Sequence, residues 1–301
     1  MTKKKSLYII LLILVCTIFG FSFVIVKYLL EINFPTFLLL GLRFTIGAGF
    51  LLLIRKFIRL PKINEKEIRN GFVLGIVIFI GFALQTFGAI FTTPAKNGLF
   101  TGLYVIFVPL IIIIIKRKFS LKPILLAILS FIGVVVVSNV FVGNLSINIG
   151  DILTVLCALA FAIQFVLLEK YAPSLNPINF TIIQLLTVAG VSIILSLLTE
   201  TNFYISIQWG KVLLSLIFLG VFSTGLAYYI QTVVQTKISA NTVSVVSCME
   251  SVFAIIFSIL LKYDVFSMSL LVGSLIIIVS MIISSISNQE NLIGNESLVS
   301  G

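Results

Sequence analysis

The sequence contains ten apolar runs, each close to the length that a helix needs to cross a lipid bilayer. The hydrocarbon core of a bilayer is about 30 Å thick, so a spanning helix takes about 20 predominantly apolar residues. The alternating ten-residue strands of outer-membrane barrels do not occur. We therefore predict an all-α integral membrane protein with ten transmembrane helices. The predicted spans are residues 7–30, 36–54, 71–91, 98–115, 123–142, 151–168, 178–198, 211–230, 242–261 and 266–286.

The composition supports this fold class and excludes several kinds of function. Hydrophobic residues make up 60% of the chain and charged residues only 10%, whereas soluble domains carry about 25% charged residues. The chain has no histidine, and its three cysteines lie far apart inside apolar runs, so we predict no metal site, no disulfide framework and no cofactor. A phosphate-binding loop of the Walker A type is also absent. We predict that the protein is not an enzyme.

The distribution of basic residues predicts the orientation in the membrane. The first apolar run is too long for a signal peptide, so we expect an uncleaved first span. With the N-terminus in the cytoplasm, 15 of the 20 Lys and Arg residues fall on inner segments and three on outer segments. This bias follows the positive-inside rule and predicts a cell membrane protein with both termini cytoplasmic. The net charge of +10 then reflects orientation and contact with anionic lipid, and we predict no nucleic-acid partner.

The two halves of the chain share a pattern at an offset of 142 positions. Each half holds five predicted spans, and because five is odd the second half would enter the membrane upside down. We therefore predict two inverted repeats, residues 1–142 and 150–286, followed by a disordered cytoplasmic tail, 287–301. The residues matched by this offset are Phe19 with Phe161, Ser22 with Gln164, Phe23 with Phe165, Lys27 with Glu169, Pro35 with Pro177, Leu84 with Leu226 and Pro109 with Ser251.

Three stretches carry a resemblance to a known family. They are ALQTFGAIFTTPAKNGLFTGLYVIFVPLI (83–111), GDILTVLCALAFAIQFVLLEKYA (150–172) and AYYIQTVVQTKISANTVSVVSCMESVFA (227–254). The chain resembles the EamA-like branch of the drug/metabolite transporter superfamily. That resemblance implies a transporter of small metabolites, often an exporter, with spans 1–4 and 6–9 around a central cavity and spans 5 and 10 outside it. The family usually has proline after the ninth-span glutamate, where this chain has Ser251, and often Trp-Gly in the first span, where this chain has Phe19-Gly20.

Two charged residues inside predicted spans are candidates for substrate binding. Glu250 lies near the middle of a span, where an ionised carboxylate costs about 2.5–3.5 kcal/mol, so a lipid-facing position is unfavourable. It could bind a cationic or zwitterionic substrate, accept a coupling proton, or form a buried hydrogen bond to a neighbouring helix. Arg43 could hold a substrate carboxylate, pair with an acid such as Glu250, or extend to the membrane surface.

Uncharged residues within the spans complete the predicted site. Each polar one could instead hydrogen-bond to a neighbouring helix. Tyr228 is preferred to Tyr229 because adjacent residues point to different sides of a helix, and Pro109 is predicted to be a hinge. Lys27 and Glu31 are interpreted as a helix-end pair. The predicted substrate-binding residues are Phe19, Ser22, Arg43, Gln85, Tyr104, Gln164, Tyr228 and Glu250.

These features together predict a secondary active transporter, and an exporter, that works by alternating access around a cavity near the midplane. The predicted substrate is an amino acid, an amine or a neutral metabolite, with coupling to protons or to a counter-substrate. An organellar antiporter of nucleotide-sugars or phosphorylated metabolites is the main alternative. It would need several cations in the cavity, and only Arg43 and Lys27 lie within spans. A channel or a non-transporting scaffold is the remaining alternative.

Overall fold

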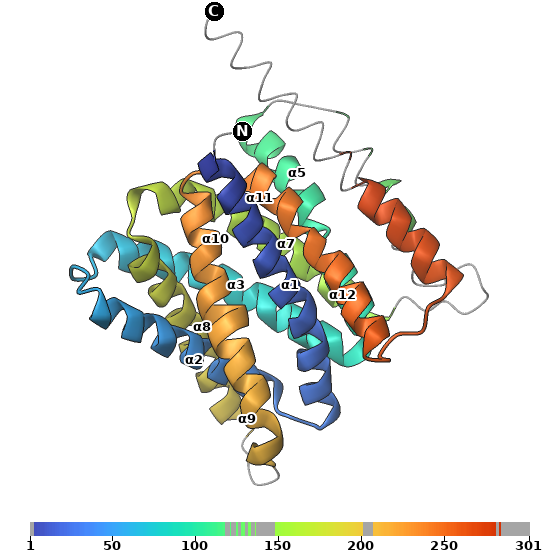
Figure 1. Cartoon of the computed structure of the whole chain (residues 1–301), viewed down its shortest axis with the longest axis horizontal. Coiled ribbons are helices and arrows are strands. Elements are labelled where there is room, and N and C mark those ends of the chain that lie inside the picture. Colours follow the sequence, from blue (N-terminus) through green and yellow to red (C-terminus); the bar gives the residue numbers. More distant parts are fainter. Residues whose placement is uncertain are drawn as a thin grey trace, which may run out of the picture.

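The computed structural model describes residues 3–117, 148–200 and 207–280, with single positions at 121, 125, 128, 129, 132, 133, 136 and 283. All regular structure in these residues is helical, as predicted (Figure 1). Eight helical stretches are long and apolar enough to cross a membrane, and they correspond to predicted spans one to four and six to nine. Their bounds are Ser6–Glu31, Thr36–Phe57, Glu65–Phe91, Pro94–Ile115, Ile149–Ser174, Pro177–Thr199, Trp209–Gln235 and Ala240–Leu260.

The predicted count of ten spans remains a prediction. In the region of the predicted tenth span the described residues form a shorter apolar helix, Met268–Ser280. Most of the predicted fifth span, 123–142, lies outside the described residues, as does the predicted tail 287–301. Gly133, one of the described positions in that fifth span, lies so close to Ile277 that a Cβ atom added to it would be 2.6 Å from the Ile277 side chain. The predicted fifth span therefore contacts the Met268–Ser280 helix at this point.

Several spans consist of more than one helical segment. Span four is α4 (Pro94–Thr101) followed by α5 (Tyr104–Lys116), and span nine is α11 (Ala240–Ser247) followed by α12 (Met249–Leu260). Span eight contains α9 (Trp209–Ile217), the π-helical segment η4 (Phe218–Leu226) and α10 (Ala227–Gln235). The other helices are α1 (Lys3–Glu31), α2 (Thr36–Phe57), α3 (Glu65–Phe91), α7 (Ile149–Tyr171) with the 3-10 turn η2 (Ala172–Ser174), and α8 (Pro177–Thr199).

The two broken spans begin and break in the same way. The Thr93 side chain caps α4 and the Ser239 side chain caps α11, and each cap precedes a helix of eight residues. Aligning the two spans by these caps gives an offset of 146, whereas the predicted repeat has an offset of 142. Tyr104 and Glu250 then occupy equivalent places just after the two breaks. The proposed match of Pro109 with Ser251 is not the structural one.

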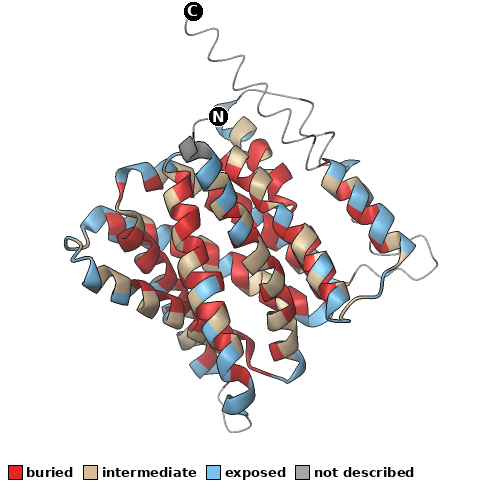
Figure 2. Cartoon of the chain, in the orientation of Figure 1, coloured by how far each residue is buried: buried red, intermediate tan, exposed pale blue. Residues whose placement is uncertain are grey.

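The helices pack in two sets that each draw on both halves of the chain. Helix α8 packs against α2 and α3, α3 also packs against α7, and α12 packs against α1 and α4. Glycines allow these close approaches: a Cβ atom on Gly75 would lie 2.6 Å from the Thr187 side chain, and Gly98 lies directly against Ala254. Buried residues face the interior of the bundle, and exposed Leu and Ile side chains lie on its outside (Figure 2). This distribution suits a surrounding lipid phase.

Acidic side chains hold the ends of many helices. In the part of the chain that the structure describes, five of them accept hydrogen bonds from backbone N–H groups at helix N-termini, where the helix dipole favours negative charge. Glu200, for example, accepts from the Phe37 and Leu38 N–H groups at 2.9 Å each and so joins the end of α8 to the start of α2. The five residues are Glu67, Asp151, Glu169, Glu200 and Asp264.

Lys27 and Glu169, which the predicted repeat matches with each other, each bind the end of a helix. The Lys27 ammonium donates to the Ala89 and Thr92 carbonyl oxygens at 3.0 and 3.1 Å, at the end of α3. The Glu169 carboxylate accepts from the Ala240 N–H at 2.8 Å, at the start of α11. Lys27 therefore binds the helix that precedes the connection from α3 to α4, whereas Glu169 binds the helix that follows the connection from α10 to α11. Lys27 thus binds the carbonyl end of α3, and no Lys27–Glu31 ion pair occurs among the described residues.

Candidate functional site

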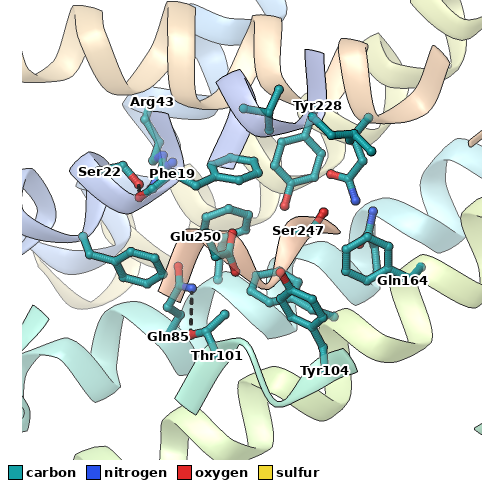
Figure 3. A pocket seen from close by; sticks show the side chains of 17 residues that line it. Phe19, Ser22, Arg43, Gln85, Thr101, Tyr104, Gln164, Tyr228, Ser247 and Glu250 are labelled. Carbon is teal, nitrogen blue, oxygen red and sulfur yellow. Dashed lines mark hydrogen bonds between the residues drawn. The ribbon is translucent and has the colours of Figure 1, made fainter. Parts of the chain in front are cut away.

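A cavity lies in the centre of the bundle between α1, α2, α3, α4, α5, α7, α10, α11 and α12 (Figure 3). Its empty space is about 530 Å³, a volume that includes the open approaches to the cavity. All eight residues predicted to bind substrate line it, although their role in binding remains a prediction. They are Phe19, Ser22, Arg43, Gln85, Tyr104, Gln164, Tyr228 and Glu250.

Aromatic rings form much of the cavity wall. The Phe82 ring lies 5.3 Å from the Phe161 ring and 5.9 Å from the Tyr228 ring, measured between centroids. Phe19 packs edge-on against Tyr228 at 6.0 Å. Gly81 makes room for the Phe161 ring, since a Cβ atom there would lie 2.7 Å from it. Rings at these distances stabilise one another, so the cavity has a firm apolar wall.

Arg43 is the cation that enters this cavity from α2. Only 2% of its surface is exposed, so it does not extend to the membrane surface. Its Nε donates to the Thr224 hydroxyl and its Nη2 to the Ser223 hydroxyl, both at 3.1 Å. The guanidinium carbon lies 4.8 Å from the centre of the Phe82 ring, a cation–π contact. No carboxylate pairs with Arg43 in the residues that the structure describes, and the pairing with Glu250 considered from the sequence is not found.

Glu250 enters the cavity from the first turn of α12, directly after the break at Cys248. Its side chain is 5% exposed, and among the described residues it has neither an ion pair nor a hydrogen bond of ordinary geometry. Figure 3 shows its carboxylate directed toward the middle of the cavity. The Tyr104 hydroxyl faces this carboxylate and interacts with it, although the two do not form a hydrogen bond of ordinary geometry. No basic residue pairs with this carboxylate in the described part of the chain, and Tyr104 is the polar neighbour that it meets.

The other predicted polar residues differ in how well they are satisfied. Ser22 donates to the Phe19 carbonyl oxygen at 2.7 Å within α1, and Gln85 donates to the Thr101 hydroxyl at 3.2 Å. The Gln164 amide nitrogen is buried and has no partner among the described residues. A buried polar atom without a partner costs about 1–3 kcal/mol. The Gln164 amide therefore has an N–H donor that is free to bind a ligand in the cavity.

Several residues that line the cavity were missed from the sequence. Phe161 and Phe165 carry a signal that could have found them, because they match Phe19 and Phe23 in the first half. Gln231 lies one helical turn after Tyr228, so it shares that face of α10. The remaining residues lack such a signal. The lining residues that were not predicted are Leu12, Val15, Phe23, Phe82, Thr101, Phe161, Phe165, Gln231 and Ser247.

Two further predictions concern the helices around the cavity. Tyr228 lines the cavity, whereas its neighbour Tyr229 packs elsewhere in the core. The sequence favoured Tyr228 as the residue that faces the cavity. Pro109 lies inside α5, and the helix continues to Lys116. The break in this span lies earlier, between Thr101 and Tyr104, so a hinge at Pro109 remains a prediction. No group of three potential metal ligands occurs in the described residues.

Comparison with known proteins assigns this architecture to a transporter family. Residues 6–139 and 148–286 each match the model of the EamA-like transporter family. An uncharacterized transporter of Archaeoglobus fulgidus is 30% identical over 276 residues, which cover 91% of this chain and 84% of that protein. A solved crystal structure aligns with a TM-score of 0.63 over 91% of this chain and 98% of its own. At 18% identity, that likeness concerns the fold alone.

Proposed function

Because this chain belongs to the EamA-like transporter family, and is thus a multi-pass membrane transporter rather than an enzyme, we propose that it exports small zwitterionic metabolites such as amino acids. The transport is secondary and active, driven by a proton gradient or by exchange with a counter-substrate. The substrate binds in the central cavity, with its carboxylate at Arg43 and its ammonium group at Glu250. Its apolar part lies against the aromatic wall.

The observation that carries this proposal is that one cavity holds an arginine and a glutamate that do not pair with each other. Arg43 and Glu250 are both buried, and among the described residues they form no ion pair with each other or with a third group. A buried charge without a partner is strongly destabilising. A zwitterion supplies a partner to each charge at once and adds no net charge to the site.

The same observation disfavours the other substrate classes. An amine would leave Arg43 without a counter-charge, and a neutral metabolite would leave both charges without one. Nucleotide-sugars and phosphorylated metabolites need several cations, but Arg43 is the one basic residue that lines the cavity in the described part of the chain. Lys27 is occupied at the end of α3.

Alternating access follows from the arrangement of two related halves around one cavity. The family model matches each half separately, the helices α2 and α8 pack against each other, and the broken spans four and nine begin and break alike. These features support an inverted repeat, whose two parts would rock against each other to open the cavity to either side. The surplus of basic residues on one side supports a plasma-membrane location with both termini cytoplasmic.

Counterflow in proteoliposomes tests this proposal. We expect purified protein to exchange at least one of the twenty amino acids, and Glu250→Gln to raise its KM about 10- to 100-fold, because a charge-assisted hydrogen bond to the ammonium group is lost. Glu65→Gln is the matched control, since Glu65 is exposed at the start of α3. Unchanged transport by Glu250→Gln, or steady conductance in planar bilayers, would contradict the proposal.

A further inference from the structure

Arg43 is held by neutral groups that leave much of its hydrogen-bonding capacity free. A guanidinium group has five N–H donors, and hydroxyl groups accept from two of them. The other three have no acceptor among the described residues. A carboxylate partner would have neutralised the arginine, whereas two hydroxyls and the Phe82 ring orient it and preserve its charge. The free donors therefore remain available to an anionic ligand.

Both hydroxyls come from adjacent residues of the π-helical segment η4. Ser223 and Thr224 are fully buried, and they lie in the middle of Phe218–Leu226. A π-helix bonds from residue i to residue i+5, so it has more residues per turn than an α-helix, and it frequently occurs at functional sites. Neighbouring side chains consequently point in more similar directions. This explains how two consecutive hydroxyls can reach one guanidinium group.

Glycines bring η4 close enough to α2 for these hydrogen bonds. A Cβ atom on Gly47 of α2 would lie 2.8 Å from the Gly220 carbonyl oxygen, and one on Gly225 would lie 3.0 Å from the Gly47 carbonyl oxygen. The first approach is closer than real Cβ atoms show, and the second is closer than nearly all of them. The segment η4 thus lies against the backbone of α2 one turn after Arg43, with glycine on both sides of the contact.

We propose that Ser223 and Thr224 are positioning residues for substrate recognition: they set the orientation of the Arg43 guanidinium so that it binds the carboxylate of the substrate with two N–H groups. This inference rests on the proposed function. According to this inference, η4 determines how strongly the protein prefers substrates that carry a carboxylate over analogues that lack one. The two hydroxyls act through Arg43 and do not touch the substrate.

Paired substrates in the counterflow assay test this role. The probes are L-phenylalanine and phenethylamine, which share a ring and an ammonium group and differ in the carboxylate. We expect Ser223→Ala combined with Thr224→Val to raise the KM for L-phenylalanine about tenfold and to leave that for phenethylamine unchanged. Thr232→Val is the matched control, because this buried hydroxyl of the same span bonds to Thr181 and the Tyr228 carbonyl oxygen.

Three comparisons separate positioning from a general structural effect. In an Arg43→Gln background the two substitutions should have no further effect on the KM for L-phenylalanine. Thr224→Ser keeps a hydroxyl and should restore most of the affinity. If the double variant does not fold, each single substitution is expected to raise that KM about threefold. An equal loss for both probes, or a further loss in the Arg43→Gln background, would overturn the inference.

The failure of this inference can be distinguished from failure of the proposed function. If none of the twenty amino acids is exchanged, or if Arg43→Gln leaves the preference for L-phenylalanine over phenethylamine intact, the proposed function is wrong and the positioning role falls with it. If Arg43→Gln abolishes that preference but the Ser223→Ala and Thr224→Val variants keep it, only the positioning role is wrong.

Discussion

Replacing Lys27 by methionine removes a charged group that binds the end of α3 while keeping most of the apolar volume of the side chain. The ammonium group donates to the Ala89, Ile90 and Thr92 carbonyl oxygens at 3.0, 3.3 and 3.1 Å. Carbonyls in the last turn of a helix have no partner within that helix. Lysine near this end therefore satisfies them and also interacts favourably with the helix dipole.

The cost of the substitution can be worked from these contacts. A hydrogen bond from a charged donor contributes about 1.5–3 kcal/mol, and Lys27 makes two of good geometry. The Lys27 side chain is only half-buried, so water partly replaces its hydrogen bonds in the variant. We therefore expect the free energy of unfolding to fall by about 2–3 kcal/mol. For a chain of 301 residues, with an unfolding entropy of about 2.1 cal/mol/K per residue, that corresponds to a decrease in Tm of about 3–5 °C.

Thermal unfolding of the detergent-solubilised protein, followed by tryptophan fluorescence, measures this loss. Lys211→Met is the matched control, since Lys211 is exposed at the start of α9. Glu169→Gln should lower the Tm by a smaller amount, because one hydrogen bond to the Ala240 N–H is weakened there. If Lys27→Met and Lys211→Met shift the Tm equally, Lys27 does not stabilise this junction and the account of it is wrong.

Two further predictions concern packing and orientation. Gly75→Leu should abolish the monodisperse peak in size-exclusion chromatography, because any side chain there collides with α8. Gly49→Leu is the control and should be tolerated, since nothing lies within 4 Å of a Cβ atom at that position. Equal behaviour of the two variants would refute the close packing. Single cysteines at Lys66 and Lys211, in a background without the native cysteines, should react with a membrane-impermeant maleimide from opposite sides of the membrane. Labelling from one side would contradict the inverted repeat.

The extent of each span was predicted only in part from the sequence. The apolar runs located the spans well, because the thickness of the bilayer limits their length. The third predicted span began at residue 71, but α3 begins at Glu65, since Asn64 and Glu67 form a capping box that extends the helix into a polar segment. The breaks in spans four and nine were missed because they do not interrupt the apolar pattern.

The candidate site was predicted best where polar residues interrupt an apolar run. Burying such a residue against lipid is unfavourable, so Arg43, Glu250 and Gln164 could be assigned to the interior from the sequence. Phe82 could not, because it is one of 27 phenylalanines, and an aromatic residue is equally stable against lipid or against a cavity. The wall of the cavity therefore became evident only in the structure.

The sequence by itself determined where the chain crosses the membrane and which polar side chains must turn inward, because both depend on the transfer of each residue between water and lipid. The tertiary structure decided which groups those side chains meet. It joined Arg43 to Ser223 and Thr224, some 180 positions away, and Lys27 to α3 rather than to Glu31. These partners depend on the rotation of each helix about its axis and on the distance between helices. Both are set by close packing at glycines such as Gly47, which hydrophobicity along the chain does not encode.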